Sequence, residues 1–170
     1  MTAPILLPDA EGQGWRHCAA PGASLWIKGY LYSHSDAGLL EELVRLDWTT
    51  PALDAALRAL DGHFAIFLRR GDSCLAVADR LRSIPLFYSI ADGRLAGLSH
   101  RGGALARAGG LGPGDVDPVG ALSVAMAGYT IGGDSIYSRL KTLTAGEYLF
   151  AEKTGAAQVR RYDRYSPWQV

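Results

Sequence analysis

The sequence predicts an α+β fold, a sandwich of antiparallel sheets flanked by helices. Two neighbouring runs, Phe64–Arg69 and Leu75–Asp79, are apolar at both alternating positions. A strand with one face in water would alternate with polar residues, so these two strands are expected to be covered on both faces. Segments with helical spacing lie between the strand pairs, and short turn-forming sequences join the strands into hairpins.

The composition limits the class of protein. The chain has 170 residues, 48% of them apolar, which suits one domain with a sizeable core. Its 17 basic and 17 acidic side chains balance, which argues against a nucleic-acid or anionic-membrane partner because these select a basic surface. No apolar run approaches the roughly 20 residues that cross a bilayer, and the N-terminus lacks the pattern of a secretory signal. The two cysteines, Cys18 and Cys74, favour a reducing compartment, so we expect the cytoplasm.

The chain divides into a short arm and a single domain. Residues 1–14 are rich in proline, glycine and acid, and we expect an extended arm there. Residues 15–170 are expected to form the domain. Its first hairpin pairs Trp15–Ala20 with Ser24–Tyr32, because the intervening Pro21-Gly22 favours a turn.

Two helices are expected after this hairpin. Asp36 is predicted to cap the first, which carries leucines at helical spacing. Thr50 and Pro51 start the second, and Gly62 ends it. Beyond the buried strand pair, the expected elements are a hairpin of Leu86–Ile90 and Arg94–Leu98, a short helix at Ala104–Ala108, a helix from Asp117 to Met126, and a hairpin of Glu147–Ala151 and Ala157–Tyr162 that turns at Thr154-Gly155.

The run Leu60–Ser89 is the most informative stretch of the chain. It contains LDGHFA, then a Gly-Asp turn, then DRLRSIPLFY. This order resembles the core hairpin of the class II glutamine amidotransferase domain of asparagine synthetases. Gly128–Tyr148 and Arg160–Tyr165 resemble later segments of that family, and Gly97–His100 stands where the family has Ala-Ser-Glu. The resemblance covers approximately Leu25 to Tyr165.

The resemblance implies an N-terminal-nucleophile-hydrolase-like α-β-β-α sandwich of two antiparallel sheets flanked by helices. It also implies a nucleophile at the first residue whose own α-amine acts as general base. An Asn-Gly pair forms the family's oxyanion hole, while an aspartate and an arginine bind glutamine. In the family, this domain supplies ammonia to an ATP-dependent, amide-forming domain.

Thr2 stands where the family has its nucleophilic cysteine, and it becomes N-terminal if Met1 is removed. A threonine hydroxyl can act as such a nucleophile. The alternative is an ordinary residue on a loose arm, because nearby prolines interrupt the strand that would hold it. Cys18 is a second candidate nucleophile if residues 1–17 are removed. Otherwise it is a small buried residue of the first hairpin.

Lys28, Gly29 and Tyr30 occupy the place of the family's Asn-Gly-Glu. Gly29 can supply a backbone N–H to an oxyanion hole, but Lys28 is not an amide, and losing one such donor lowers the rate about 10²–10³-fold. Asp36 resembles the aspartate that binds the α-ammonium of glutamine, or it caps a helix. Lys28, Tyr30 and Asp36 are therefore the candidate substrate-binding residues. Arg16 is the only arginine before Lys28, and no arginine clamp for the carboxylate is apparent.

No cofactor or metal site is expected. The four histidines are scattered, without the spacing of metal ligands. Ile131–Ser135 lacks the full nucleotide loop of the synthetases. Asp79, Arg80 and Arg82 are expected to form a structural ion-pair corner.

Because nucleophile, oxyanion amide and carboxylate clamp are all altered, the sequence predicts a degenerate, non-catalytic amidotransferase domain. We expect it to act as a scaffold or partner subunit of an asparagine-synthetase-like, ATP-dependent enzyme, or with a peptide substrate; a homo-oligomer is an alternative assembly. The scaffold role predicts an exposed apolar patch around Leu81–Phe87 or Tyr129–Ile136.

Two other functions stay open. One is an active amidohydrolase or glutaminase that uses Thr2 and the Gly29 N–H. The other is a module that binds a small molecule or peptide near Asp36 and Tyr30.

Overall fold

The structure, a computed structural model, describes residues 5–7, 14–152, 156–166 and 168. The helices are α1 Asp36–Arg45, α2 Pro51–Ala59, α3 Gly102–Ala108 and α4 Pro118–Ala127, with a 3₁₀ turn at Pro113–Asp115. The strands are β1 Ile5–Leu7, β2 Trp15–Ala20, β3 Ala23–Leu31, β4 Gly62–Arg70, β5 Ser73–Ala78, β6 Phe87–Ala91, β7 Arg94–Ser99, β8 Leu140–Thr142, β9 Glu147–Ala151 and β10 Gln158–Arg161.

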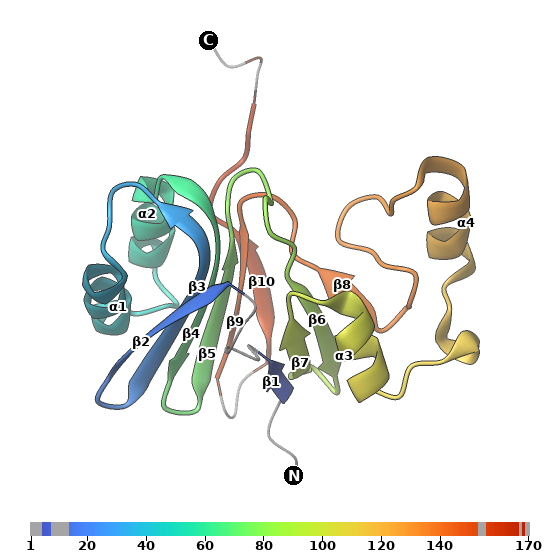
Figure 1. Cartoon of the computed structure of the whole chain (residues 1–170), viewed down its shortest axis with the longest axis horizontal. Helices are drawn as coiled ribbons and strands as arrows, with labels where there is room; N and C mark the ends of the chain where they lie inside the picture. The colour runs from blue at the N-terminus through green and yellow to red at the C-terminus, as the bar shows by residue number, and fades with distance from the viewer. Residues whose placement is uncertain (1–4, 8–13, 153–155, 167, 169–170) are drawn as a thin grey trace.

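These strands form two sheets that pack against each other (Figure 1). The six-stranded sheet has the order β10-β9-β5-β4-β3-β2 and is antiparallel throughout. The four-stranded sheet has the order β1-β7-β6-β8; it is antiparallel except that β1 runs parallel to β7. Helices α1 and α2 cover the outer face of the larger sheet, and α3 packs on the smaller one. The predicted α+β sandwich flanked by helices is confirmed.

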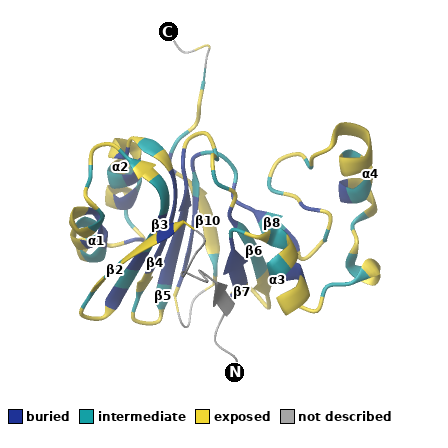
Figure 2. Cartoon of the chain, viewed as in Figure 1, coloured by how far each residue is buried: buried dark blue, intermediate teal, exposed yellow. Residues whose placement is uncertain are grey.

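The middle of the six-stranded sheet is buried on both faces, as its apolar pattern predicts (Figure 2). In β4, Phe64, Ile66 and Leu68 pack in one cluster with the leucines of α1 and α2. The alternate residues, Ala65 and Phe67, pack in a second cluster with side chains of the four-stranded sheet. Successive side chains of a strand point to opposite faces, so one strand contributes to both halves of the core.

The predicted helix starts are close to the observed ones. Ser35, and not Asp36, caps α1: its Oγ accepts a hydrogen bond from the backbone N–H of Gly38 at 3.1 Å. Both residue types are good caps, and the carboxylate of Asp36 is engaged elsewhere. Asp117 caps α4 as predicted, accepting from the N–H of Val119 at 3.0 Å.

Two short strands were not predicted. Strand β8 is three residues long, too short to show an alternating pattern, and pairs with β6. Strand β1 lies within the segment expected to be an extended arm and pairs with β7. Most other residues of that arm, and the predicted turn at Thr154-Gly155, lie outside the described residues. The division of the chain into an arm and a domain therefore stays a prediction.

Helix α4 lies away from both sheets, at the right of Figure 1. Within it, Gly120 is the buried residue, and a Cβ there would collide with the backbone carbonyl of Ser135, so the helix packs closely on the returning chain at this point. Val119, Leu122 and Met126 are exposed. No helix among the described residues has the length and apolar character that crossing a membrane requires.

The end of β5 is held by a buried carboxylate. Asp79 is 1% exposed, and its Oδ2 accepts from the N–H of Phe64 at 2.8 Å. Its Oδ1 accepts from the N–H of Leu81 at 2.7 Å, and both oxygens accept from the N–H of Ser83 at 3.2 Å. The Asp79 backbone carbonyl also accepts from the N–H of Gly146 at 3.0 Å. One residue thus connects β4, the chain leading to β6 and the turn before β9.

The predicted ion-pair corner is therefore wrong: backbone amides, and not arginines, satisfy Asp79. Arg80 lies 4.0 Å from the carboxylate of Asp163, and Arg82 donates to the hydroxyl of Thr142 at 3.3 Å. Backbone N–H groups are fixed in place, so they can satisfy a buried carboxylate without ordering a long side chain.

We expect Asp79→Ala to lower the free energy of unfolding by about 3–5 kcal/mol, because three backbone N–H groups lose their charged acceptor. Urea unfolding monitored by circular dichroism measures this loss. Glu41→Ala, which removes an exposed carboxylate on α1 and its surface ion pair with Arg45, is the matched control and should cost about 0.5 kcal/mol or less. A loss below about 1 kcal/mol for Asp79→Ala would contradict the role given to this carboxylate.

Candidate functional site

The predicted site residues lie on β3 and in the first turn of α1. Lys28, Gly29 and Tyr30 are consecutive residues of β3, and Asp36 is the first residue of α1. Thr2 lies outside the described residues, so its position and its role as a nucleophile stay untested.

Asp36 forms a two-point ion pair with Arg16. The Nε of Arg16 donates to one carboxylate oxygen at 2.8 Å, and its Nη2 donates to the other at 3.0 Å. The remaining Nη1 donates to the backbone carbonyl of Gly29 at 2.5 Å. The hydrogen bond with Asp36 is the main cause that raises the pKa of Arg16. We call these three groups the Arg16–Asp36–Gly29 network.

Sequence reasoning missed this network. Arg16 and Asp36 are 20 residues apart, and nothing local indicates that β2 and α1 lie side by side. The apolar residues of α1 do predict a packed helix, but not the strand that it packs against. Arg16 is the only arginine before Lys28, and this was the one feature of the sequence that could have singled it out as a partner of Asp36.

Cys18 is adjacent to the network and is a poor nucleophile in this setting. Its Sγ donates to the backbone carbonyl of Asp36 at 3.4 Å. Burial raises the pKa of the thiol, and the charge of Asp36 raises it further. The reactive form of cysteine is the thiolate, so both effects favour the inert protonated form. Cys74 is buried in β5, where burial raises its pKa to about 11.

Gly29 is required by the packing of β3 on β4. Its φ is +91°, and a Cβ at this position would collide with the backbone carbonyl of His63. On the neighbouring strand, a Cβ on Gly62 would likewise collide with the carbonyl of Tyr30. Close approach of the two backbones is therefore sufficient to explain this glycine.

Lys28 and Asp36 lie toward opposite faces of the six-stranded sheet. Lys28 is paired with Trp15, whose side chain belongs to the cluster between the two sheets. Arg16, the next residue of β2, points to the other face and reaches Asp36 on α1. Tyr30 is 71% exposed. The structure thus joins Gly29 with Asp36, but it separates both from the side chain of Lys28.

His100 is a neighbour of Lys28 that sequence reasoning did not select. Its Nδ1 accepts a hydrogen bond from the indole N–H of Trp15 at 3.4 Å. Burial lowers the pKa of His100, and the charges of Lys28 and Arg101 lower it further. Its place in the family-like Gly97–His100 segment was the only signal in the sequence.

The described ranges contain no group of three or more His, Cys, Asp or Glu side chains placed to hold a metal ion.

We expect Gly29→Ala to destabilise the protein more than Gly22→Ala. Gly22 also has a positive φ of +76°, but a Cβ there would meet nothing within 4 Å. The control should therefore cost about 1–2 kcal/mol, the strain of a left-handed residue. Gly29→Ala should cost at least about 2 kcal/mol more, because β3 and β4 must move apart. Equal losses in chemical unfolding would show that strand packing does not require Gly29.

The chain was compared with protein families, curated proteins and solved structures. No family model matches the chain, and no curated protein matches it. Among solved structures, it is similar to the glutamine phosphoribosylpyrophosphate amidotransferase from B. subtilis complexed with ADP and GMP, with a TM-score of 0.45 and 13% sequence identity. The match covers 86% of this chain and 31% of that chain, so this chain spans less than a third of that protein's length. The similarity is to an amidotransferase at low identity, and the asparagine synthetase relationship stays a prediction.

Proposed function

We propose that this chain is a non-catalytic relative of the asparagine-synthetase-type amidotransferase domain, with the fold of the N-terminal-nucleophile hydrolases. We infer that it acts as a scaffold or docking subunit of an ATP-dependent, amide-forming enzyme. The order of the sequence motifs supports the relationship, together with the two packed sheets flanked by helices. The observation that carries the loss of activity is the Arg16–Asp36–Gly29 network.

The network occupies one of the groups that would bind glutamine, the carboxylate of Asp36. Both carboxylate oxygens of Asp36 accept from one guanidinium, and a fork of this kind is among the stronger charged pairs in proteins. An incoming α-ammonium would have to compete with it. The side chain of Lys28, which replaces the amide of the oxyanion hole, lies toward the other face of the sheet. Both observations support the proposal that glutamine does not bind at these residues.

The docking role is supported by an exposed apolar surface on and after α4. It consists of Val119, Leu122, Met126, Tyr129 and Ile131, all more than half exposed, and we call it the α4 surface. No charged residue lies within α4 itself. Patches of this kind mark protein interfaces, and a partner would have to present an uncharged, apolar face to it.

The apolar patch predicted around Leu81–Phe87 does not form. Leu81 is 70% exposed, but Leu86 is buried in the core between the sheets. The patch predicted around Tyr129–Ile136 agrees better with the structure, because Tyr129 and Ile131 are exposed and belong to the α4 surface.

We expect the full chain to remain unmodified by an electrophilic glutamine analogue, because no group in the described residues is assembled to activate it. Intact mass spectrometry followed by peptide mapping measures this. An active class II amidotransferase, treated in parallel, serves as the positive control. An adduct on Thr2 in a chain that has lost Met1 would establish the active enzyme instead, and so would an adduct on Cys18 after loss of residues 1–17.

We expect Leu122→Asp to weaken association with the asparagine-synthetase-like enzyme of the same organism by more than about tenfold, because a charge would be buried in an apolar interface. Co-expression, co-purification and calorimetric titration measure this association. The matched control is Leu81→Asp, since Leu81 is 70% exposed against 58% for Leu122 and lies outside the α4 surface. The docking proposal fails if the two variants bind alike, or if the unmodified chain does not bind that enzyme.

A further inference from the structure

Three positively charged or titratable side chains meet where β7 ends beside β2 and β3. Lys28 is paired with Trp15 across the β2–β3 hairpin, and the indole N–H of Trp15 donates to His100 at 3.4 Å. Arg101 follows His100 directly in the chain. Both Lys28 and Arg101 are close enough to lower the pKa of His100 by their charge. We call Lys28, His100 and Arg101 the basic cluster.

The basic cluster has no acidic partner among the described residues. Other cations of the described chain do have one: Arg16 pairs with Asp36, Arg139 with Asp115, Lys141 with Asp134 and Arg161 with Glu147. No carboxylate contributes to the shift of the His100 pKa; burial and the two cations lower it. Lys28 and His100 are half-buried and Arg101 is exposed. The cluster is thus a positively charged site that a solute can reach.

The hydrogen bond from Trp15 also determines which ring nitrogen of His100 can donate a hydrogen bond. Because Nδ1 accepts from the indole, the neutral ring carries its proton on Nε2. At neutral pH, His100 is therefore a hydrogen-bond donor, and Lys28 and Arg101 supply charge. All three groups are hydrogen-bond donors, and the planar guanidinium of Arg101 matches a planar carboxylate.

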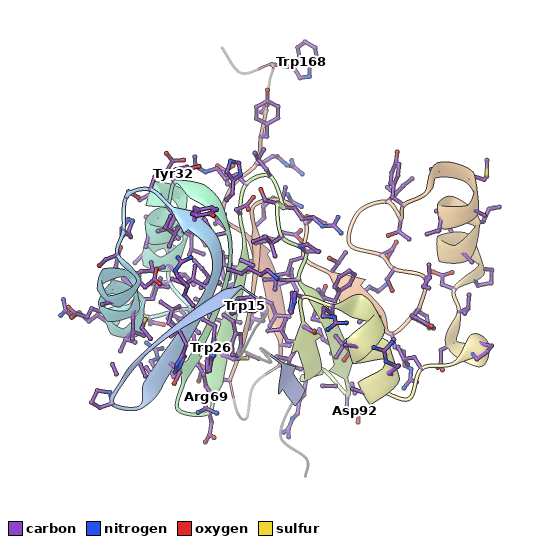
Figure 3. The ribbon with its side chains drawn as sticks, viewed as in Figure 1. Trp15, Trp26, Tyr32, Arg69, Asp92 and Trp168 are labelled. Atoms are coloured by element: carbon purple, nitrogen blue, oxygen red, sulfur yellow. The ribbon has the colours of Figure 1, made fainter. Side chains whose placement is uncertain are left out.

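An aromatic surface adjoins the cluster. Trp26 lies two residues before Lys28 on β3, so their side chains share the face that is turned to the smaller sheet. Its ring stacks on His17 with centroids 4.8 Å apart and packs on Phe67 at 5.3 Å. Figure 3 shows Trp15 and Trp26 near each other on the six-stranded sheet, and Trp26 packs against the cluster that contains Trp15. Trp26 is half-buried and His17 is exposed, so the aromatic surface is partly open.

We propose that the basic cluster binds the carboxylate of a small aromatic acid, whose ring packs against Trp26. The site uses the side of β3 that is opposite to the Arg16–Asp36–Gly29 network. The site does not involve the α4 surface, so the test of this proposal is independent of the test of the docking role.

The test is a titration of the full chain with benzoate at neutral pH. The signals followed by NMR are the imidazole of His100 and the indole N–H of Trp15. Acetate, which has the charge without the ring, and benzyl alcohol, which has the ring without the charge, are the matched probes. We expect benzoate to bind about tenfold more tightly than either one. Bound benzoate should also raise the pKa of His100, because a nearby anion favours the imidazolium.

Variants assign the binding to these residues. Lys28→Met and Arg101→Gln should each weaken benzoate binding about tenfold, since each removes one charged donor. Arg69→Gln should not change it, because Arg69 is on the same sheet face but is paired with Ser24, four residue pairs along the strands from Lys28. Thermal unfolding checks that Lys28→Met folds; if it does not, the exposed Arg101→Gln decides.

Three results would each overturn the proposal. The first is the absence of benzoate-dependent shifts at His100 and Trp15. The second is equal affinity for benzoate and one of its matched probes. The third is binding that Arg101→Gln leaves unchanged. Each of them leaves the α4 surface and its partner untouched.

Discussion

The buried carboxylate of Asp79 is the constraint on which the arrangement of the two sheets depends. A charge in the interior is costly unless hydrogen bonds replace the water that it loses. Here the replacements are backbone N–H groups of Phe64, Leu81 and Ser83, so the charge determines the path of the chain from β5 toward β6. The Asp-Arg pair that gave the sequence its family resemblance therefore has a structural reason that is independent of catalysis. A protein can keep this feature after its chemistry has changed.

The layered core could be predicted from the sequence because strand burial leaves a local pattern. Five consecutive apolar residues in β4 can be satisfied only if both faces are covered. The site could not be predicted in the same way, because it depends on contacts between distant segments. Ser35 and Asp36 are equally good helix caps, and only the presence of Arg16 on the neighbouring β2 strand decides which of them is free to cap. Strand β8 escaped prediction for a different reason, since three residues are too few to show a period.

Helix α4 is the place where local sequence and observed environment disagree. A helix that is apolar around its whole circumference is usually buried, yet Gly120 is the residue of α4 that the fold buries. Sequence alone could predict the helix and its ends, but not that its side chains face outward. Covering the exposed apolar side chains of such a helix with a second apolar surface lowers the free energy of the system. This conflict between pattern and burial is the observation on which the docking proposal rests.

Successive side chains of β2 point to opposite faces of the sheet, so the ion pair of Arg16 and the surroundings of Trp15 lie on different faces. Arg16 and Cys18 turn toward α1, where Arg16 neutralises Asp36. Trp15 turns toward the smaller sheet, where it lies beside Lys28 and His100. Asp36, which we propose stands in the place of the family's ammonium-binding aspartate, and the side chain of Lys28 thus lie toward opposite faces of the sheet. Among the residues that the structure describes, Lys28 has no carboxylate partner on its own face, and this is the electrostatic condition for the proposed binding of an anion.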